Sequence, residues 1–450
     1  MDNKKSFEEI QKYNTFIYDR FEIEYQEKVL NIIYYYQIEG LKKFVHRLSI
    51  PYSNNNLDHD FIEKLVFNIG LLEAVSYWKA TIAPKFVIQC GTITDKQKEF
   101  FRKIYYYGLG EFFYLNKIDP VYDAFVQFEC TGKLYNKEID YDGIGSMIAI
   151  GGGKDSCVTL SLYEKKNSSC FIINPKDIML DCAFIAGYQE HEIYKIKRVI
   201  DKGLLELNAE GFLNGHTPFS AMVAFVSFLT AYLNHKKYIV LSNESSANEA
   251  NVINTKINHQ YSKSYEFEQD FQAYAREFLN KEIKYYSFLR PLSEYQIGML
   301  FSRNKSFHKV FKSCNVGSKN ENWKWCCHCA KCLFVYCLLS PFLYQKELVS
   351  IFGEDLFSKE TLLTTFIDLI GKGETKPFDC VGTFEEINYA ITKTIKNLGQ
   401  KDLPYLLDYY FKQYYDESIL KKDLEHYYNE KNCLSEQEIR KIKEVISYDK

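Results

Sequence analysis

The sequence feature that most constrains the fold of this chain is a glycine-rich turn. It lies between a short apolar run and a segment that favours a helix. Residues 147–150 (Met-Ile-Ala-Ile) favour a buried strand, and they lead directly into Gly151-Gly-Gly-Lys-Asp-Ser156. Residues 157–162 then favour a helix. Three glycines let the backbone turn tightly and bring its N–H groups close to an anion, while the helix N-terminus and Lys154 add positive charge. The sequence therefore predicts a phosphate-binding loop.

This loop matches neither of two common nucleotide-binding motifs. A Walker A loop needs Ser or Thr after the lysine, where this chain has Asp155, and its first glycine is replaced by Ile148. Ser156 likewise occupies the third glycine position of the dinucleotide fingerprint.

In its strand–loop–helix setting, GGGKDS resembles the SGGKDS signature of the PP-loop ATP pyrophosphatases, with Gly151 in place of the usual serine. The resemblance implies that ATP is cleaved between its α and β phosphates and that the loop holds the pyrophosphate. It assigns Asp155 to magnesium or to loop geometry. The residues expected to hold ATP are Gly151, Gly152, Gly153, Lys154, Asp155 and Ser156.

Short apolar runs recur through the middle of the chain and predict an α/β fold. Residues 147–150, 170–173 and 238–241 are continuous β-favouring runs separated by helical segments, as buried parallel strands are. With the loop resemblance, this predicts a Rossmann-like parallel sheet of the PP-loop, adenine nucleotide alpha hydrolase-like type.

The sequence patterns before and after this central part of the chain favour helices. We predict a mainly helical N-terminal region at residues 1–140 that recognises substrate, with one strand candidate at residues 85–90. An ATP-binding α/β domain with a cysteine cluster is predicted at residues 141–344. A helical region that contributes to the active site is predicted at residues 345–450.

The balance of charged residues limits the classes of molecule that this chain is expected to bind. The chain has 56 Lys+Arg and 59 Asp+Glu, a net charge of −3, so it lacks the basic excess of a nucleic-acid-binding protein. The N-terminus has no apolar run, which predicts a cytoplasmic protein. Residues 217–234 are the longest stretch without a charged residue or His, but their polar content predicts a buried helix and no membrane span.

Six of the thirteen cysteines lie between residues 314 and 337. A Cys-x-x-Cys-x-x-Cys run with one cysteine upstream can close a tetrahedron of thiolates around structural Zn²⁺. Spacing alone leaves Cys327 and His328 as alternative ligands. The arrangement also resembles the zinc site of 7-cyano-7-deazaguanine synthase, a PP-loop enzyme, and this resemblance selects Cys314, Cys326, Cys329 and Cys332.

Polar blocks follow the predicted strand at residues 238–241, where ligands bind in open α/β sheets. In chain order, GGGKDS, LSNESSANEAN, NHQYSKSYEFE, RPLSE, SCN, WCCHCAKC and KPFDCVG resemble the motif string of the UDP-N-acetylmuramoyl-L-alanyl-L-glutamate epimerase family. VSYWK at residues 75–79 and YGLGEF at residues 107–112 also look like this family, so the resemblance covers most of the chain. Ala250 and Cys327 stand where the pattern has glycine.

This resemblance implies that ATP and Mg²⁺ are used, that AMP and pyrophosphate form, and that the terminal L-Glu of UDP-MurNAc-L-Ala-L-Glu becomes D-Glu in peptidoglycan precursor synthesis. A muramoyl-L-alanine L-glutamate ligase is the implied pathway partner. Adenylation makes the Cα–H acidic enough for a positioned base to remove the proton. Inversion needs an acid and a base, for which the candidates are Cys380 with either His259 or Lys263.

Further contacts are expected along the polar blocks. Those predicted for ATP or its Mg²⁺ are Asn243, Glu244 and Glu249. Those predicted for substrate are Tyr261, Ser262, Ser264, Glu268, Arg290 and Glu294. Structural alternatives are an Arg290–Glu294 ion pair, a buried Cys380, and acidic side chains that face water. The alternative functions are another PP-loop adenylating enzyme that forms an amide or thiolates a small molecule, an epimerase of a different peptide, and a non-catalytic nucleotide-binding module.

Overall fold

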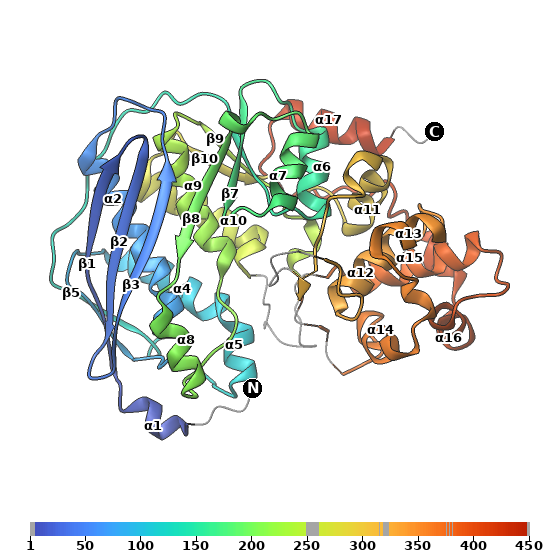
Figure 1. Cartoon of the computed structure of the whole chain (residues 1–450), viewed down its shortest axis with the longest axis horizontal. Coiled ribbons are helices and arrows are strands. Elements are labelled where there is room, and N and C mark those ends of the chain that lie inside the picture. Colours follow the sequence, from blue (N-terminus) through green and yellow to red (C-terminus); the bar gives the residue numbers. More distant parts are fainter. Residues whose placement is uncertain are drawn as a thin grey trace.

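The computed structural model describes residues 5–248, 261–314, 316–317, 324–374, 376–377, 379 and 381–447. The described residues form one ten-stranded sheet in the order β10-β9-β6-β7-β8-β3-β2-β1-β4-β5 (Figure 1). In chain order the strands are β1 (Thr15–Gln26), β2 (Val29–Ile38), β3 (Lys42–Pro51), β4 (Lys85–Ile88), β5 (Gln127–Cys130), β6 (Ser146–Ala149), β7 (Ser168–Ile173), β8 (Ile193–Val199), β9 (Tyr238–Leu241) and β10 (Lys284–Ser287).

Half of this sheet is a parallel α/β unit made of β10, β9, β6, β7 and β8. β6 comes first in the chain, β7 and β8 extend the sheet on one side, and β9 and β10 extend it on the other. The order therefore reverses between β6 and β9, and in such sheets this switch point is where ligands bind, beyond the carboxyl ends of the strands. The α/β class and the three predicted strands at residues 147–150, 170–173 and 238–241 are confirmed.

Apolar residues cover both faces of the parallel unit. Met147 of β6 and Ile239 of β9 belong to one hydrophobic core, whereas the next residues, Ile148 and Val240, belong to the other. Successive side chains of a strand point to opposite faces, so continuous apolar runs are the sequence of a sheet buried on both sides.

Helices pack on both faces of the parallel unit, and those that lie between β6 and β10 in the chain connect its strands. They are α6 (Lys154–Leu162), α7 (Asp177–Ile185), α8 (Lys202–Ala209), α9 (Phe219–Leu233), α10 (Tyr265–Tyr274), α11 (Glu294–Arg303) and α12 (Ala330–Leu339). α9 coincides with the predicted buried helix at residues 217–234, and twelve of its residues are buried. No helix in the described ranges has both the length and the apolar character that crossing a membrane requires.

The N-terminal part of the chain corrects the prediction of a mainly helical region. Its helices are α1 (Phe7–Gln11), α2 (His59–Glu73), α3 (Val75–Trp78), α4 (Asp95–Gly108) and α5 (Gly110–Leu115), but β1, β2 and β3 form an antiparallel meander beside them. Buried and half-buried residues alternate along the whole of β2. This period of two is not visible in the sequence, because Tyr and Ile residues occur on both faces of the strand. β3 pairs with β8, so the sheet runs across residue 140.

A buried ion pair fixes α2 to β8. Arg198 of β8 donates to both carboxylate oxygens of Glu73 at 2.6–2.9 Å, and His46 Nε2 lies 3.5 Å from Glu73 Oε2. Burial opposes the charge on Glu73, but Arg198 and His46 outweigh burial and lower the pKa of this carboxyl to about 2.

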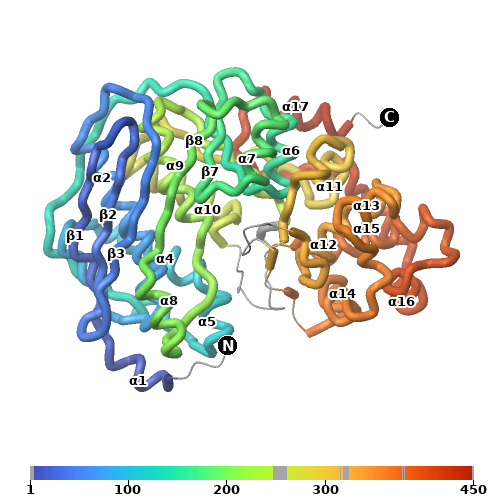
Figure 2. The backbone as a smooth tube through the Cα atoms, viewed as in Figure 1, coloured from blue at the N-terminus to red at the C-terminus, as the bar shows by residue number. Residues whose placement is uncertain are grey.

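The described residues after Gln345 are helices joined by loops: α13 (Gln345–Phe352), α14 (Leu363–Leu369), α15 (Phe384–Asn397), α16 (Tyr405–Tyr414) and α17 (Glu436–Ser447). α13 to α16 lie on the far side of the molecule from the β1–β3 meander (Figure 1). The chain then returns with α17 to the parallel unit, as the backbone trace shows (Figure 2). There Tyr286 of β10 donates to Glu438 of α17 at 2.5 Å.

Candidate active site

A cavity of about 330 Å³ lies at the carboxyl ends of β6, β7 and β9. Ile150 follows β6, Ile173 ends β7 and Asn243 follows β9, and all three line it. The cavity is therefore at the switch point between β6 and β9 and on the adjoining side of β7, the position that the strand order predicts for a ligand.

The glycine-rich turn forms one wall of this cavity. Gly152 adopts a φ of +76°, a conformation that favours glycine, and Gly153 is the N-cap of α6. Gly151, Gly153, Asp155 and Ser156 line the cavity, and the Ser156 hydroxyl donates to the Gly153 carbonyl at 3.0 Å. The predicted strand–loop–helix arrangement is confirmed.

Helix N-termini converge on the cavity. The first turns of α6, α9 and α12 contribute lining residues, among them Ser156, Ser220 and Lys331. None of these three helices has a side-chain hydrogen bond at its N-cap. The N–H groups of a first turn and the helix dipole attract anions, so the cavity is suited to phosphate or carboxylate groups.

Lys154 is fully buried at the first position of α6. Its ammonium group forms ion pairs with Asp155 and with Glu294, the first residue of α11. Burial opposes the charge, but the carboxylates of Asp155, Glu294 and Glu244 outweigh burial and raise the pKa of Lys154. Lys154 therefore stays positively charged inside the protein.

The three carboxylates that act on Lys154, those of Asp155, Glu244 and Glu294, line the cavity. Burial raises the pKa of Glu294, with Lys154 acting against this shift and Asp155 and Glu244 adding to it. Glu244 is also buried and lines the same cavity. Carboxylate oxygens at this density are the donors that a hard divalent cation prefers, so the residues present fit Mg²⁺.

Arg290, predicted to contact substrate, is fully buried and contacts the backbone of residues that line the cavity. It donates to the backbone carbonyls of Glu244 and Lys263, both at 2.7 Å, and to Glu268 Oε2 at 3.0 and 3.2 Å. The alternative prediction of an Arg290–Glu294 ion pair is wrong, because the partner is Glu268 and Glu294 pairs with Lys154.

Most of the other residues that were predicted to contact substrate make hydrogen bonds within the protein instead. The Tyr261 hydroxyl donates to Asp270 at 3.1 Å, and Ser264 caps α10 by accepting from the Phe267 N–H at 3.1 Å. Ser262 is buried. Of the residues predicted to act at the site, Asn243, Glu244, Lys263 and Glu294 line the cavity with the loop. Predicted residues Glu249, His259 and Cys380 lie outside the described residues.

Among the lining residues to which the sequence patterns assign no role are Lys312, Ser313 and Lys331. All three lie within two residues of a cysteine of the predicted metal site. The available signal was that Ser313 and Lys331 lie within the family motifs SCN and WCCHCAKC, whose cysteines were interpreted as metal ligands.

The four cysteines chosen for the metal site meet beside the cavity. The sulfur atoms of Cys314, Cys326, Cys329 and Cys332 all lie within 4.8 Å of one another. Sγ–Sγ separations are 3.5, 3.7 and 3.9 Å for the pairs 329–332, 326–332 and 314–329. Zn–S bonds of about 2.3 Å place tetrahedral sulfurs about 3.8 Å apart, so this cluster could hold a metal ion such as zinc.

Backbone N–H groups support the cluster. Those of Gly317 and Cys326 donate to Cys314 Sγ at 3.1 and 3.4 Å, which favours the thiolate that a metal needs.

Comparison with known proteins assigns most of the chain to one family. Residues 7–288 match the MurL N-terminal domain, and residues 310–419 match the MurL C-terminal domain. This chain belongs to the MurL family.

Its relatives include three proteins that are each named UDP-N-acetyl-alpha-D-muramoyl-L-alanyl-L-glutamate epimerase. The one from a Micromonospora species is 32% identical over 342 residues, 75% of this chain and 76% of the relative. Those from Xanthomonas oryzae pv. oryzae and Salinispora tropica are each 30% identical, covering 84% and 81% of this chain and 85% and 81% of the relatives. No solved structure matches the chain. The family expected from the motif string is confirmed.

In this MurL chain the two alternative metal ligands lie away from the four sulfurs. Cys327 is buried and its thiol donates to the Phe352 carbonyl at 3.2 Å, whereas His328 is exposed and its ring contacts the Cys326 carbonyl. Cys327 has a φ of +58°, which explains why the motif pattern has glycine at this position.

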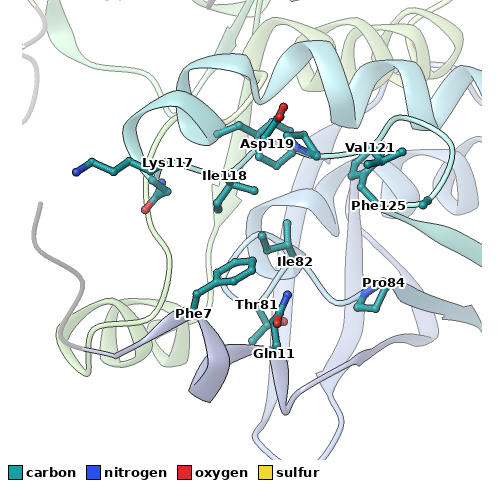
Figure 3. A pocket seen from close by; sticks show the side chains of 14 residues that line it. Phe7, Gln11, Thr81, Ile82, Pro84, Lys117, Ile118, Asp119, Val121 and Phe125 are labelled. Carbon is teal, nitrogen blue, oxygen red and sulfur yellow. The ribbon is translucent and has the colours of Figure 1, made fainter.

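A larger cavity of about 660 Å³ lies elsewhere in this MurL chain, between α1 and the segment after α5 (Figure 3). Its lining is mostly apolar, and its charged members are Lys117 and Asp119. In Figure 3 the Lys117 side chain points away from the other labelled residues. The smaller cavity, which gathers the loop, the carboxylates and the lysines, is therefore the candidate active site.

Proposed function

We propose that this chain is an ATP-dependent epimerase that converts the terminal L-Glu of UDP-MurNAc-L-Ala-L-Glu to D-Glu. The proposal is supported by membership of the MurL family and by relatives of 30–32% identity that carry the name of this epimerase. The observation that carries the chemistry is the cavity lined by the glycine-rich turn and three carboxylates, two of which, Asp155 and Glu294, pair with the buried Lys154.

ATP is proposed to bind with its phosphates on the loop at residues 151–156. The uncapped N-termini of α6, α9 and α12 and the charge of Lys154 support an anion at this place. The resemblance of GGGKDS to the PP-loop signature favours cleavage between the α and β phosphates, with pyrophosphate held by the loop.

Mg²⁺ is proposed to bind to carboxylates drawn from Asp155, Glu244 and Glu294. When bound, the ion would offset the charge that accumulates on the phosphates. Lys154, which pairs with Asp155 and Glu294, would keep a positive charge next to the loop that receives the phosphates.

Adenylation explains why an epimerase needs ATP. The α-carboxylate of the terminal Glu attacks the α phosphate, the bond to the β phosphate breaks, and pyrophosphate leaves. The acyl-adenylate lacks the carboxylate charge, so a base can take the Cα proton and an acid can return a proton from the opposite face. Water then cleaves the mixed anhydride and releases AMP with the epimerised peptide.

The acid and base are proposed to be Cys380 with either His259 or Lys263. Lys263 lines the cavity, which supports it as the member that meets the reacting carbon. Arg290 holds the Lys263 carbonyl and acts as a positioning residue.

We also propose that the four-cysteine cluster holds structural zinc, and that the product enters peptidoglycan precursor synthesis. The substrate would come from a ligase that joins L-Glu to the muramoyl-L-alanine precursor.

The deciding experiment incubates the purified chain with UDP-MurNAc-L-Ala-L-Glu, ATP and Mg²⁺ in D₂O. We expect D-Glu in the hydrolysed peptide, deuterium at its α-carbon, and AMP that depends on the substrate. Reactions without ATP, and a Lys154→Gln variant, are the controls and should give neither product. AMP without α-deuterium would replace the epimerase with another adenylating activity, and the absence of both would reject the proposal.

A further inference from the structure

Two lysines connect the metal cluster to the cavity. Lys312 lies two residues before Cys314, and Lys331 lies between Cys329 and Cys332. Both lysines line the cavity. Each segment that supplies ligands to the cluster therefore also supplies a cation to the candidate active site.

The segment before Cys314 contacts the glycine-rich turn directly. The Lys312 N–H donates to the Gly152 carbonyl at 2.9 Å. The hydroxyl of the next residue, Ser313, also lines the cavity. Lys312 Nζ lies 5.8 Å from the ring centre of Trp325, the neighbour of Cys326, so this lysine is held between the turn and the cluster.

Lys331 is placed by the other half of the cluster. Cys329 is the N-cap of α12, and Lys331 is the second residue of that helix. Its side chain is 6% exposed. Lys331 and Lys154 both lie over the ring of Phe334, with Nζ-to-centroid distances of 4.9 and 5.8 Å. The two ammonium groups therefore contact the same aromatic side chain, and of the two lysines Lys331 lines the cavity.

We propose that Lys312 and Lys331 bind the polyphosphate that the loop receives, and that the four-cysteine metal site holds these lysines in place. Metal binding and polyphosphate binding are then linked, each strengthening the other by the same factor. The inference rests on the proposed function for the identity of the anion, and it gives the cluster a role beyond folding. A cluster that only stabilised the fold would not need to order residues on the cavity wall.

The first test measures binding of inorganic pyrophosphate and of ATP with Mg²⁺ to the zinc-loaded protein by calorimetry. Lys312→Gln and Lys331→Gln should keep one zinc and the wild-type melting temperature, and each should lose tenfold or more in affinity. Lys359→Gln is the matched control, because Lys359 donates to the Cys327 carbonyl at 2.9 Å beside the cluster but does not line the cavity. It should bind both ligands as the wild type does. Wild-type affinity in both cavity-lysine variants would overturn the proposal.

The second test measures zinc affinity by competition with a chelator, with and without pyrophosphate. Pyrophosphate should tighten zinc binding in the wild type and in Lys359→Gln, and the effect should be lost in the Lys312→Gln, Lys331→Gln double variant. If the zinc affinity of the wild type is the same with and without pyrophosphate, the linkage is refuted.

Neither test depends on epimerisation, so the two proposals can fail separately. If Lys312 and Lys331 bind pyrophosphate as expected but the protein forms no D-Glu, the proposed function is rejected and the inference is not. Epimerisation with unimpaired Lys312→Gln and Lys331→Gln variants would reject the inference alone.

Discussion

The hydroxyl of Ser313 lies 2.8 Å from the point that a Cβ atom on Gly153 would occupy. The glycine-rich turn and the segment that leads into the metal cluster are therefore packed as closely as a glycine allows. Contacts of this kind make the two segments one structural unit, although 160 residues of sequence separate Gly153 from Ser313.

Gly153→Ala should weaken pyrophosphate binding without unfolding the protein. The new methyl group must push the Ser313 hydroxyl aside, whereas the φ of −90° at this position suits alanine. Ser313→Ala should weaken binding by a similar factor. The double variant should bind no more weakly than either single variant, because one change displaces the Ser313 hydroxyl and the other removes it. Titration calorimetry on the three variants checks this, and additive losses would contradict it.

Gly152→Ala should lower the free energy of unfolding by about 1–2 kcal/mol, because alanine is strained at a φ of +76°. Gly151→Ala is the matched control, since a Cβ there has no neighbouring atom within 4 Å. Urea unfolding should separate the two variants, and equal stabilities would argue against the turn geometry.

Arg290→Lys should lower the free energy of unfolding by about 3 kcal/mol and reduce kcat. Lysine keeps the charge but cannot reach the Glu244 carbonyl, the Lys263 carbonyl and Glu268 together. Arg20→Lys, at an exposed arginine, is the control. The checks are chemical unfolding and the rate of D-Glu formation, and an unchanged Arg290→Lys protein would remove its positioning role.

Replacing one cluster cysteine should release the metal. Metal analysis should find about one zinc per wild-type chain and much less in Cys329→Ser, because three remaining thiolates leave the tetrahedron incomplete. Cys327→Gly should retain the full equivalent, since its sulfur bonds to the Phe352 carbonyl outside the cluster. Loss of zinc from Cys327→Gly would point to a different ligand set.

Acid should destabilise the protein partly through Glu73. Its pKa is about 2 in the folded protein against 4.5 without these interactions, so its stabilisation is complete above pH 4.5 and is lost as the pH falls toward 2. The shift corresponds to about 3 kcal/mol. Denaturant unfolding between pH 5 and 3 should therefore show a shallower pH dependence for Glu73→Gln than for the wild type. Parallel curves would show that Glu73 is not the titrating group.

The predictable parts of this molecule were those encoded by neighbouring residues. Continuous apolar runs predicted β6, β7 and β9, glycine content predicted the turn before α6, and spacing with a family resemblance selected Cys314, Cys326, Cys329 and Cys332. In each case a local pattern has one dominant physical cause, which is burial on two faces, tight backbone turning or metal geometry.

The parts that could not be predicted depend on tertiary contacts. Arg290 looks like a ligand for a carboxylate until the structure places Glu268 and two carbonyls around it. Lys312 and Lys331 are ordinary lysines in the sequence, and only the structure shows that they line the cavity with the loop. The β1–β3 meander was missed because its strands carry Tyr and Ile on both faces, which weakens the contrast that identifies a strand.

The pairing of β3 with β8 has a practical consequence for anyone who divides this chain. A fragment that ends at residue 140 would leave the β8-facing side of β3 as an open edge, with its N–H and C=O groups unpaired beside Leu48 and Ile50. Such edges recruit other strands, so the fragment should aggregate. Antibody production, crystallisation and domain swaps should therefore begin from the undivided chain.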